Sequence, residues 1–371
     1  MRSVLAVVAI AWGANHAALA QTRYVATPLW GLGGPGTVAD VRPQAINERG
    51  AIAAFEYEPP GSPFSRATLY AGGTVRAIGP VGYTNGAYDV SDAGVVVGAV
   101  NRQAFAYSNG TLQVLGMLPG DGESVARAIN ASGQIAGCSY GGSRVRAFLF
   151  ESGTMRPLAS AGHADSCAQA VNALGQVAGY VATGGGTWPV VWSGTTATVL
   201  PVSNGVATGI NDRGDVVGDY FVDGVGTRAF LISGGAFRDL GTLGAGSDTQ
   251  VHDINNAGIA VGMSIALSSD IAYRAAFVWD GSMRNLNSLV VSGLEPGEWF
   301  THAYAINDAG QIAAVLRRPG GGPSYLYRLD PVAAPAAPAE VPTLAPVALI
   351  ASSLLLAAVG GATSRRRIVR R

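Results

Sequence analysis

The sequence predicts an all-β fold, a seven-bladed β-propeller of four-stranded blades closed by the strand nearest the N-terminus. Three observations lead to this prediction. One short pattern recurs seven times along the 371 residues, at a spacing of about 43 residues. Each copy belongs to a unit that contains four short apolar segments. The last unit lacks one of these segments, and a matching segment stands near the N-terminus.

The recurring pattern consists of a small residue, Ile or Val, Asn, two variable residues, Gly, one variable residue, and then Ile or Val. Its turn glycines are Gly50, Gly94, Gly133, Gly175, Gly214, Gly258 and Gly310. An Asn side chain bonds the local backbone, and a Gly adopts positive φ without steric cost. The pair therefore predicts a tight hairpin turn in every unit. The second copy departs from the pattern, because Ser91 stands in place of the Asn.

The four segments of each unit are typical of β-strands. They are rich in aromatic and β-branched residues and are separated by Gly- or Asn-bearing turns. Residues 146–150 (Arg-Ala-Phe-Leu-Phe) illustrate the third segment, and residues 155–158 (Met-Arg-Pro-Leu) the fourth. Four strands in a repeat of this length are typical of a propeller blade.

The N-terminal segment is expected to close the ring. In the last unit, strands are expected at 302–307, 311–316 and 324–329, and the fourth is missing. Residues 24–29, followed by a Gly-rich stretch, resemble the fourth strand and loop at 237–244. Pairing of 24–29 with the last blade would leave no open sheet edge. The propeller domain is therefore assigned to residues 21–330.

Composition excludes several classes of protein. The 24 basic residues, all of them Arg, balance 24 Asp and Glu, and 48% of the chain is hydrophobic. Disorder requires low hydrophobicity and high net charge. A nucleic-acid partner is not expected, because there is no basic excess to neutralise phosphates. Residues 21–330 alone carry 18 Arg against 23 acidic residues, so this domain is mildly acidic.

Residues 1–20 are predicted to be a secretory signal peptide. Arg2 precedes an apolar run over 4–12, and Ala18-Leu19-Ala20 provides a cleavage site of small residues. Cleavage is expected after Ala20. The alternative, a signal anchor, would need a longer apolar run to span a bilayer.

The C-terminal end is predicted to be a stiff linker followed by a membrane-directed tail. Residues 331–340 are rich in Pro and Ala. In the tail, 341–371, Val-Pro-Thr-Leu at 341–344 leads into an uncharged span that reaches 363, long enough to cross a bilayer as a helix. A terminal Arg cluster at 365–371 is expected to stay cytoplasmic.

The tail resembles the bacterial C-terminal sorting signals of the PEP-CTERM type, in the variant that begins Ile-Pro-Thr-Leu. The resemblance implies a membrane protease that removes the tail after export. A plain transmembrane anchor is the alternative. The expected location is therefore exported, either anchored by the tail or released to the cell surface and extracellular space.

The repeat units resemble the extracellular HAF-repeat proteins, over about residues 23–330. Gly-Thr-Leu-Gly at 241–244 and Ile-Asn-Asn-Ala-Gly at 254–258 carry the resemblance. It implies an exported repeat protein and no particular activity.

The two cysteines, Cys138 and Cys167, are expected to form a disulfide. Export places them in an oxidising compartment, and their positions relative to the turns bring both to the same end of neighbouring blades. A bridge over 29 residues would stabilise the fold by about 3 kcal/mol. Two buried free thiols are the alternative.

No catalytic, metal-binding or cofactor-binding motif is present, so no catalytic residue, metal or cofactor is expected. The strongest candidate for binding is the long connection before the seventh unit. Its candidate ligand-binding residues are Glu295, Glu298, Trp299, Phe300 and His302. Loops on a rigid scaffold often carry binding residues. Alternatively, Trp299 and Phe300 fill the ring near its closure.

The sequence therefore favours an exported, non-enzymatic repeat protein. We expect it to act as a binding or scaffold module at the bacterial cell envelope or extracellular matrix, with a glycan or protein partner. The alternative is a carbohydrate-active enzyme that uses two carboxylates as acid and base. The candidate carboxylates are Asp121, Glu123, Glu295 and Glu298.

Overall fold

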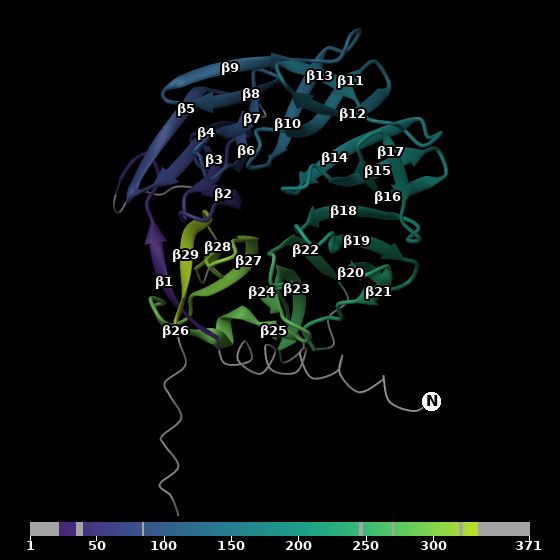
Figure 1. Cartoon of the computed structure of the whole chain (residues 1–371). Coiled ribbons are helices and arrows are strands. Elements are labelled where there is room, and N and C mark those ends of the chain that lie inside the picture. Colours follow the sequence, from purple (N-terminus) through teal and green to yellow (C-terminus); the bar gives the residue numbers. More distant parts are fainter. Residues whose placement is uncertain are drawn as a thin grey trace, which may run out of the picture. The chain divides into compact units, whose positions relative to one another are not determined.

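The chain folds into seven antiparallel sheets arranged in a ring (Figure 1). The computed structural model describes residues 22–34, 40–83, 85–244, 248–268, 271–318 and 322–332. Within these residues the only helix is a single 3-10 turn, η1 (Leu286–Leu289). The prediction of an all-β, seven-bladed propeller with four-stranded blades is confirmed.

The first three blades follow one another along the chain, each with its strands in order from the inside of the ring outward. Blade 1 consists of β2 (Asp40–Ile46), β3 (Ile52–Tyr57), β4 (Phe64–Ala71) and β5 (Thr74–Tyr83). Blade 2 consists of β6 (Gly86–Val90), β7 (Val96–Val100), β8 (Gln103–Ser108) and β9 (Thr111–Gly116). Blade 3 consists of β10 (Glu123–Ile129), β11 (Ile135–Gly141), β12 (Arg144–Glu151) and β13 (Thr154–Pro157).

The next three blades repeat this order. Blade 4 consists of β14 (Asp165–Val171), β15 (Val177–Thr183), β16 (Gly186–Ser193) and β17 (Thr196–Val199). Blade 5 consists of β18 (Gly205–Ile210), β19 (Val216–Val222), β20 (Gly226–Ser233) and β21 (Ala236–Asp239). Blade 6 consists of β22 (Thr249–Ile254), β23 (Ala260–Ser268), β24 (Ile271–Trp279) and β25 (Met283–Asn285).

The seventh blade joins the two ends of the domain. It consists of β27 (Trp299–Ile306), β28 (Ile312–Arg317), β29 (Tyr325–Val332) and β1 (Arg23–Leu29). β1 runs antiparallel to β29, from Arg23 opposite Val332 to Leu29 opposite Leu326. This pairing confirms that the N-terminal segment completes the last blade. β29 also includes Pro331 and Val332, which the sequence had placed in the linker.

A fifth strand that the sequence did not predict covers the outer edge of β1. It is β26 (Val290–Ser292), which pairs with β1 in parallel and belongs to the connection between blades 6 and 7. Behind it, Tyr24 and Ala26 are 2% and 4% exposed and join the hydrophobic core of the blade. The closing strand is therefore held on both edges.

Each turn Asn has two structural roles. In blade 3, the Asn130 Oδ1 accepts hydrogen bonds from the backbone N–H of Ser132 at 3.1 Å and of Gln134 at 2.9 Å, which closes the hairpin as predicted. Its Nδ2 donates to the carbonyl oxygen of Asn172 in the next blade, at 3.0 Å. The residue that makes the turn therefore also joins neighbouring blades.

The bonds between blades form a belt around the ring, which we call the Asn belt. The Nδ2 donors are Asn47, Asn130, Asn172, Asn211, Asn255 and Asn307. Asn307 donates to the Asn47 carbonyl at 2.9 Å, across 260 residues, and so links the last blade to the first. Ser91 interrupts the belt, because among the described residues its side chain gives no bond to blade 3.

In five of the seven blades, a glycine on the second strand is required by close packing; Ala54 and Ala314 stand at this position in blades 1 and 7. In blade 3, Phe148 is fully buried and stands opposite Gly137. A Cβ on Gly137 would collide with the Val125 carbonyl oxygen and would lie 2.8 Å from the Phe148 ring. The aromatic residue on the third strand and the small residue on the second therefore form one packing unit.

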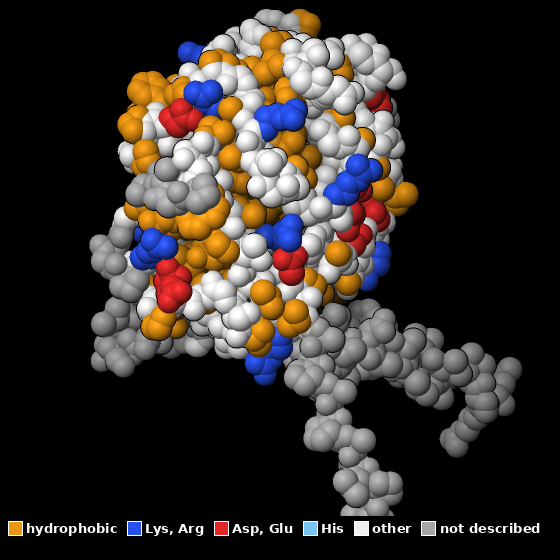
Figure 2. Space-filling model, turned by 90° about the vertical axis from the view of Figure 1, so that its left-hand side faces the viewer, with side chains coloured by type: hydrophobic (Ala, Val, Ile, Leu, Met, Phe, Trp, Pro, Cys, Tyr) orange, Lys and Arg blue, Asp and Glu red, His pale blue; other side chains and the backbone are white. Residues whose placement is uncertain are grey.

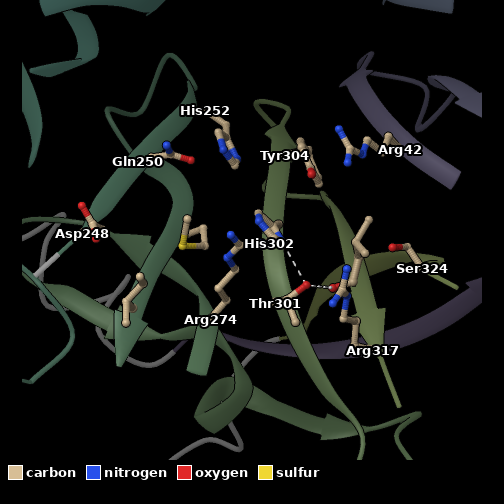
Figure 3. Close-up of a pocket in the computed structure, with 13 residues that line it drawn as sticks. Arg42, Asp248, Gln250, His252, Arg274, Thr301, His302, Tyr304, Arg317 and Ser324 are labelled. Atoms are coloured by element: carbon tan, nitrogen blue, oxygen red, sulfur yellow. Dashed lines mark hydrogen bonds between the residues drawn. The ribbon is translucent and has the colours of Figure 1, made fainter. Parts of the chain in front are cut away.

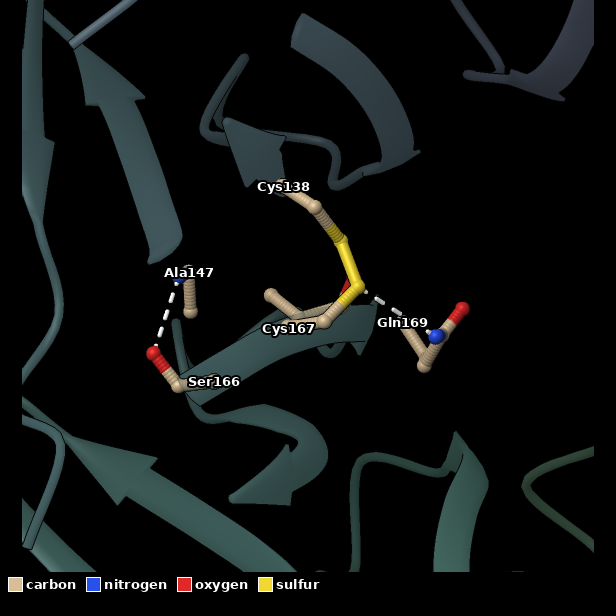
Figure 4. The surroundings of a disulfide bond; sticks show 6 residues. Cys138, Ala147, Ser166, Cys167 and Gln169 are labelled. Carbon is tan, nitrogen blue, oxygen red and sulfur yellow. Dashed lines mark hydrogen bonds between the residues drawn. A yellow bond between two sulfur atoms is a disulfide. The ribbon is translucent and has the colours of Figure 1, made fainter. Parts of the chain in front are cut away.

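A disulfide connects blades 3 and 4 (Figure 4). It joins Cys138 on β11 to Cys167 on β14, with their Cα atoms 4.9 Å apart, and both side chains are buried. The predicted bridge is confirmed, and the alternative of two free thiols is wrong. Gln169 reaches the bridge with its Nε2, 3.5 Å from the Cys167 Sγ.

The predicted signal peptide and the tail lie outside the described residues. The same holds for 333–340 of the linker. Within the described part of the chain, no helix has the length and apolar character that a membrane crossing requires.

On the outer side of the ring shown in Figure 2, hydrophobic, basic and acidic side chains are interspersed without a large patch of one charge sign.

Candidate functional site

A cavity of about 440 Å³ lies where blades 6, 7 and 1 meet (Figure 3). We call it the seam pocket. Its lining residues are Arg42, Asp248, Gln250, His252, Met263, Ile265, Arg274, Thr301, His302, Tyr304, Val315, Arg317 and Ser324. Met263, Thr301 and Val315 are buried, whereas the three arginines are exposed. The pocket therefore has a partly apolar floor and a basic rim.

Three strands from three different blades supply the arginines. Arg42 comes from β2, Arg274 from β24 and Arg317 from β28. Figure 3 shows Arg274 and Arg317 on either side of β27. None of the three has an ion-pair partner among the described residues, and Asp248 is the only carboxylate among the lining residues. The seam pocket is therefore positively charged in a domain that is acidic overall.

Three flat rings form a stack beside the arginines. The ring centroids of His252 and Tyr304 are 4.8 Å apart, with 9° between their planes. His302 lies 5.4 Å from Tyr304, at 17°. The His252 Nδ1 lies 2.9 Å from the Ala303 carbonyl oxygen, and because a carbonyl only accepts, this nitrogen is the protonated one. The stack thus spans the boundary between blades 6 and 7.

Both histidines are neutral near pH 7. Burial lowers the pKa of His252 below its usual range. For His302, burial lowers the pKa to about 3, helped by His252 and by the positive charges of Arg274, Arg317 and Arg42. A cation at this place would stand among other cations in a poorly solvated site. The charge of the pocket therefore comes from its three arginines and Asp248, and the histidines offer neutral rings.

β-bulges place the rings at the inner edge of the blades. Every inner strand has a bulge at the residue that stands three positions before the turn Asn or Ser91. These residues are Gln44, Tyr88, Arg127, Gln169, Thr208, His252 and Tyr304. Bulge residues of neighbouring blades contact one another, as His252 and Tyr304 do, and as the Arg127 guanidinium does over the Tyr88 ring at 4.9 Å.

The inner strand of blade 7 has a second bulge, at Thr301. A bulge inserts one residue and changes the direction of the next side chain, and bulges are frequent beside binding sites. Here the next residue is His302, which stands five positions before its turn Asn. Arg42 and Gln250 stand at the same position in blades 1 and 6. The three neighbouring blades therefore use one repeat position to line one pocket.

A second cavity of about 240 Å³, the side chamber, adjoins the seam pocket. It shares Arg274, Thr301, His302 and Arg317 with the seam pocket, and Tyr273 and Trp299 complete its lining. The Trp299 Nε1 is buried and has no hydrogen-bond partner among the described residues. A buried donor without an acceptor costs about 1–3 kcal/mol. This N–H is therefore enclosed by protein atoms, and the part of Trp299 that lines the chamber is its ring.

The candidates of the long connection fall into two groups. Trp299 and His302 line the cavities. Phe300 is fully buried and packs edge-on against Tyr327, at 5.4 Å between ring centroids, in the core that includes Tyr24. It therefore fills the closure of the ring and offers no surface to a ligand, as the alternative interpretation of this residue expects.

The candidate carboxylates line neither cavity. The Glu298 Oε1 pairs with the Arg318 Nε at 2.8 Å, and the backbone N–H of Glu295 donates to the Glu298 Oε2 at 3.1 Å. In blade 3, Asp121 pairs with Arg146 at 2.8 Å, and Glu123 pairs with Arg102. Three of the four carboxylates are therefore neutralised by an arginine, and blade 3 contributes no residue to either cavity.

Sequence reasoning missed Arg42, His252, Arg274, Tyr304 and Arg317. For Arg42, His252 and Tyr304 the signal lay in the repeat itself, at the variable positions three and five residues before each turn Asn, whereas Arg274 and Arg317 stand on later strands, β24 and β28. Aligning the seven units on that Asn places His252 beside Tyr304, and Arg42 beside His302. Among the described residues, no group of three or more His, Cys, Asp or Glu is placed to hold a metal ion.

Comparisons with known proteins show the fold. No protein-family model matches the chain, and no curated protein matches it. The β-propeller domain of the Trilobed protease from Pyrococcus furiosus, described as having an open velcro topology, superimposes with a TM-score of 0.50 at 10% identity. That match covers 79% of this chain and 96% of that one. In this chain, β1 closes the ring by pairing with β29.

Two further solved structures are similar at lower scores. Acylaminoacyl peptidase has a TM-score of 0.49 at 10% identity, over 79% of this chain and 51% of that one. TolB from Acinetobacter baumannii has a TM-score of 0.41 at 17% identity, over 54% of each chain. The chain thus spans about half the length of these two proteins. At these identities the likeness concerns the propeller fold alone.

Proposed function

We propose that the protein is an exported, non-catalytic propeller that binds an anionic ligand in the seam pocket, at the bacterial cell envelope or extracellular matrix. One observation carries this proposal: three arginines without ion-pair partners among the described residues converge on one cavity. Three like charges repel one another, and an anion relieves that repulsion. A rigid β-scaffold holds them in place, so little ordering is needed on binding.

The chemistry of the lining fits a bound carboxylate or phosphate. A guanidinium offers planar pairs of N–H donors that match both groups. The neutral rings of His252 and Tyr304 add flat contact area without adding charge. Asp248 is the only lining carboxylate and would favour an extended ligand over a dense cluster of negative charge.

Export is the second part of the proposal. The disulfide supports it, because such bonds persist in oxidising compartments. We assign residues 1–20 to a signal peptide and 341–371 to a sorting or anchoring tail of the PEP-CTERM type, on a protein of the HAF-repeat kind. Fractionation with intact-mass analysis tests this part. A protein that retains 1–20 and stays in the cytoplasm contradicts it.

The enzymatic alternative has less support from the cavities. Glycosidases of the usual kind place two carboxylates about 5–9.5 Å apart around the scissile bond. Among the described residues, the seam pocket has one lining carboxylate, and the side chamber has none. A binding role needs no such pair.

Binding is tested by calorimetric titration of the full chain with a panel of small and polymeric anions. Arg42→Gln, Arg274→Gln and Arg317→Gln should each weaken binding of the active anion about tenfold, the loss of about 1.4 kcal/mol expected for one charge-assisted contact. Arg144→Gln is the matched control, because Arg144 is an exposed arginine on the third strand of blade 3 and lines neither cavity. Equal binding by all four variants refutes the proposal.

A further inference from the structure

The two cavities together offer more than a charge site. They share Arg274, Thr301, His302 and Arg317, so a ligand in one cavity can extend into the other. A small anion such as phosphate would occupy only part of this space. The arginines stand on β2, β24 and β28 of three blades; Arg274 and Arg317 line both cavities, whereas Arg42 lines only the seam pocket. The site is suited to an extended ligand with separated negative charges.

The walls between the arginines are flat and amphipathic. His252, Tyr304 and His302 are nearly parallel, with 9–17° between their planes. An aromatic face packs well against the C–H face of a sugar ring, while the edges of the same rings bond hydroxyl groups. Gln250, Thr301 and Ser324 supply further polar groups to the lining. A neutral imidazole has one donor and one acceptor, and because His252 already donates to the Ala303 carbonyl, its Nε2 remains as an acceptor.

The side chamber adds an aromatic wall. Trp299 and Tyr273 line it beside Arg274 and Arg317. The Trp299 Nε1 itself is buried, so the indole offers a ring surface rather than its N–H to a sugar.

An acidic peptide that binds by strand addition fits less well. This mode needs free backbone groups on an exposed sheet edge. On the inner edges of blades 6 and 7, side chains already bond these groups. Asp219 accepts from the Val251 N–H at 2.8 Å, Asp253 from the Ile306 N–H at 2.9 Å, and His252 donates to the Ala303 carbonyl. The edges that face the pocket are therefore closed to a peptide strand.

We propose that the seam pocket and side chamber bind a segment of a carboxylated polysaccharide, with uronate carboxylates on Arg42, Arg274 and Arg317 and sugar rings against the His252–Tyr304–His302 stack. This inference rests on the proposed function and names its ligand class. The carboxylates provide the charge that the arginines require. The sugar faces and hydroxyls use the rings and the polar lining, which a bare anion leaves unused.

The test is calorimetric titration of the full chain with an α-1,4-linked galacturonate tetramer. Its fully methyl-esterified form is the matched neutral ligand, and inorganic phosphate and a tetraglutamate peptide are the comparison anions. The tetramer should bind at least tenfold more tightly than each of the other three. Methyl esterification removes only the charge, so a large loss assigns the contact to the carboxylates.

Two variants separate the sugar contact from the charge. Tyr304→Leu removes one ring of the stack and should weaken tetramer binding about tenfold, and phosphate binding by a much smaller factor. Trp299→Ala removes the indole from the lining of the side chamber, and should weaken tetramer binding about threefold. Thermal melting of each variant confirms folding, and the phosphate titration confirms an intact arginine site.

The outcomes are distinguishable. If phosphate or tetraglutamate binds as tightly as the tetramer, the sugar assignment is overturned and an anion site remains. If both variants bind the tetramer as the native chain does, the assignment of the rings is overturned. If none of the three anions binds, both this inference and the proposed function fail.

Discussion

Replacing Ser91 with Asn should complete the Asn belt and stabilise the protein. Ser91 stands at the position that Asn occupies in the other six blades. Its Oγ accepts one bond, from the Val95 N–H at 3.2 Å. Blade 6 provides the template, because Asn255 donates to the Asn307 carbonyl at 3.1 Å beside Asp253, just as Ser91 stands beside Asp89.

The expected gain follows from the bonds that are added. An Asn at 91 would donate to the Asn130 carbonyl and would accept a second backbone N–H in its own turn, as Asn130 does. Each bond adds about 0.5–1.5 kcal/mol, and ordering the longer side chain offsets up to about 1 kcal/mol. The net gain is about 1–2 kcal/mol. With an unfolding entropy of about 0.6 kcal/mol/K for some 300 residues, the Tm should rise by about 2–3 °C.

Guanidinium denaturation followed by tryptophan fluorescence measures this change, with the disulfide intact. Asn172→Ser makes the reverse substitution in blade 4, where the native Nδ2 donates to the Asn211 carbonyl at 3.0 Å, and should lose a similar amount. Ser91→Ala, which removes only the weak local bond, should change stability by less than about 1 kcal/mol. A Ser91→Asn protein no more stable than the native chain would refute the assignment of stability to the belt.

Three further predictions concern other contacts between elements. Burial raises the pKa of Asp253 to about 7, so the folded state holds a proton there that the unfolded state releases; relative to Asp253→Asn, the native chain should lose stability as pH rises from about 4 to about 7. The lowered pKa values of His252 and His302 make the protein more stable as pH rises, in the native chain and in Asp253→Asn alike. The measurement is therefore the difference in unfolding free energy between the native chain and Asp253→Asn, taken at pH 4 and at pH 8. A difference that is the same at both pH values contradicts the prediction. Cys138→Ser with Cys167→Ser should cost about 3 kcal/mol of unfolding free energy, whereas adding reductant to this double variant should change nothing more. Ala26→Glu, which buries a charge in the closing strand, should lower the Tm by more than 5 °C, and an unaltered melting curve would mean that β1 is not part of the cooperative unit.

The blades could be predicted because their signals are local. The turn needs an Asn followed three residues later by a Gly with positive φ, as at Asn130 and Gly133. The packing of the second strand on the third needs Gly137 opposite Phe148. Such requirements recur in most units, with Ser91 in place of the turn Asn in blade 2 and with Ala54 and Ala314 in place of the packing glycine in blades 1 and 7. The closing strand could be predicted because the last unit lacked its fourth strand, while residues 24–29 formed a strand that belonged to no unit.

The binding site could not be predicted in the same way. Arg42 and Arg274 are 232 positions apart in the sequence, and only closure of the ring brings blades 6, 7 and 1 together. A residue at a variable position of the repeat does not indicate a binding site by itself. It does so only when the residues beside it in the adjacent blades are known. β26 was missed for a different reason, because three residues are too few to carry an alternating pattern and the strand forms only against β1.

The two ends of the inner strands have different roles: one end joins neighbouring blades, and the other end lines the seam pocket in three blades. At one end, the turn Asn repeats and joins the blades. Five positions earlier, toward the other end, the residue is free to vary: Val125, Cys167 and Val206 stand there in blades 3 to 5. In blades 6, 7 and 1 that position holds Gln250, His302 and Arg42, all of which line the seam pocket.

This division has a mechanical consequence. The pocket arginines give no hydrogen bond to the Asn belt, so substituting them should leave the ring intact, whereas the belt can be strengthened without altering the pocket. A recognition surface can therefore change on such a propeller without loss of the fold. The seam is the place where this freedom is greatest, because β27 alone among the inner strands accommodates a second bulge, and β1 and β26 support that blade from outside.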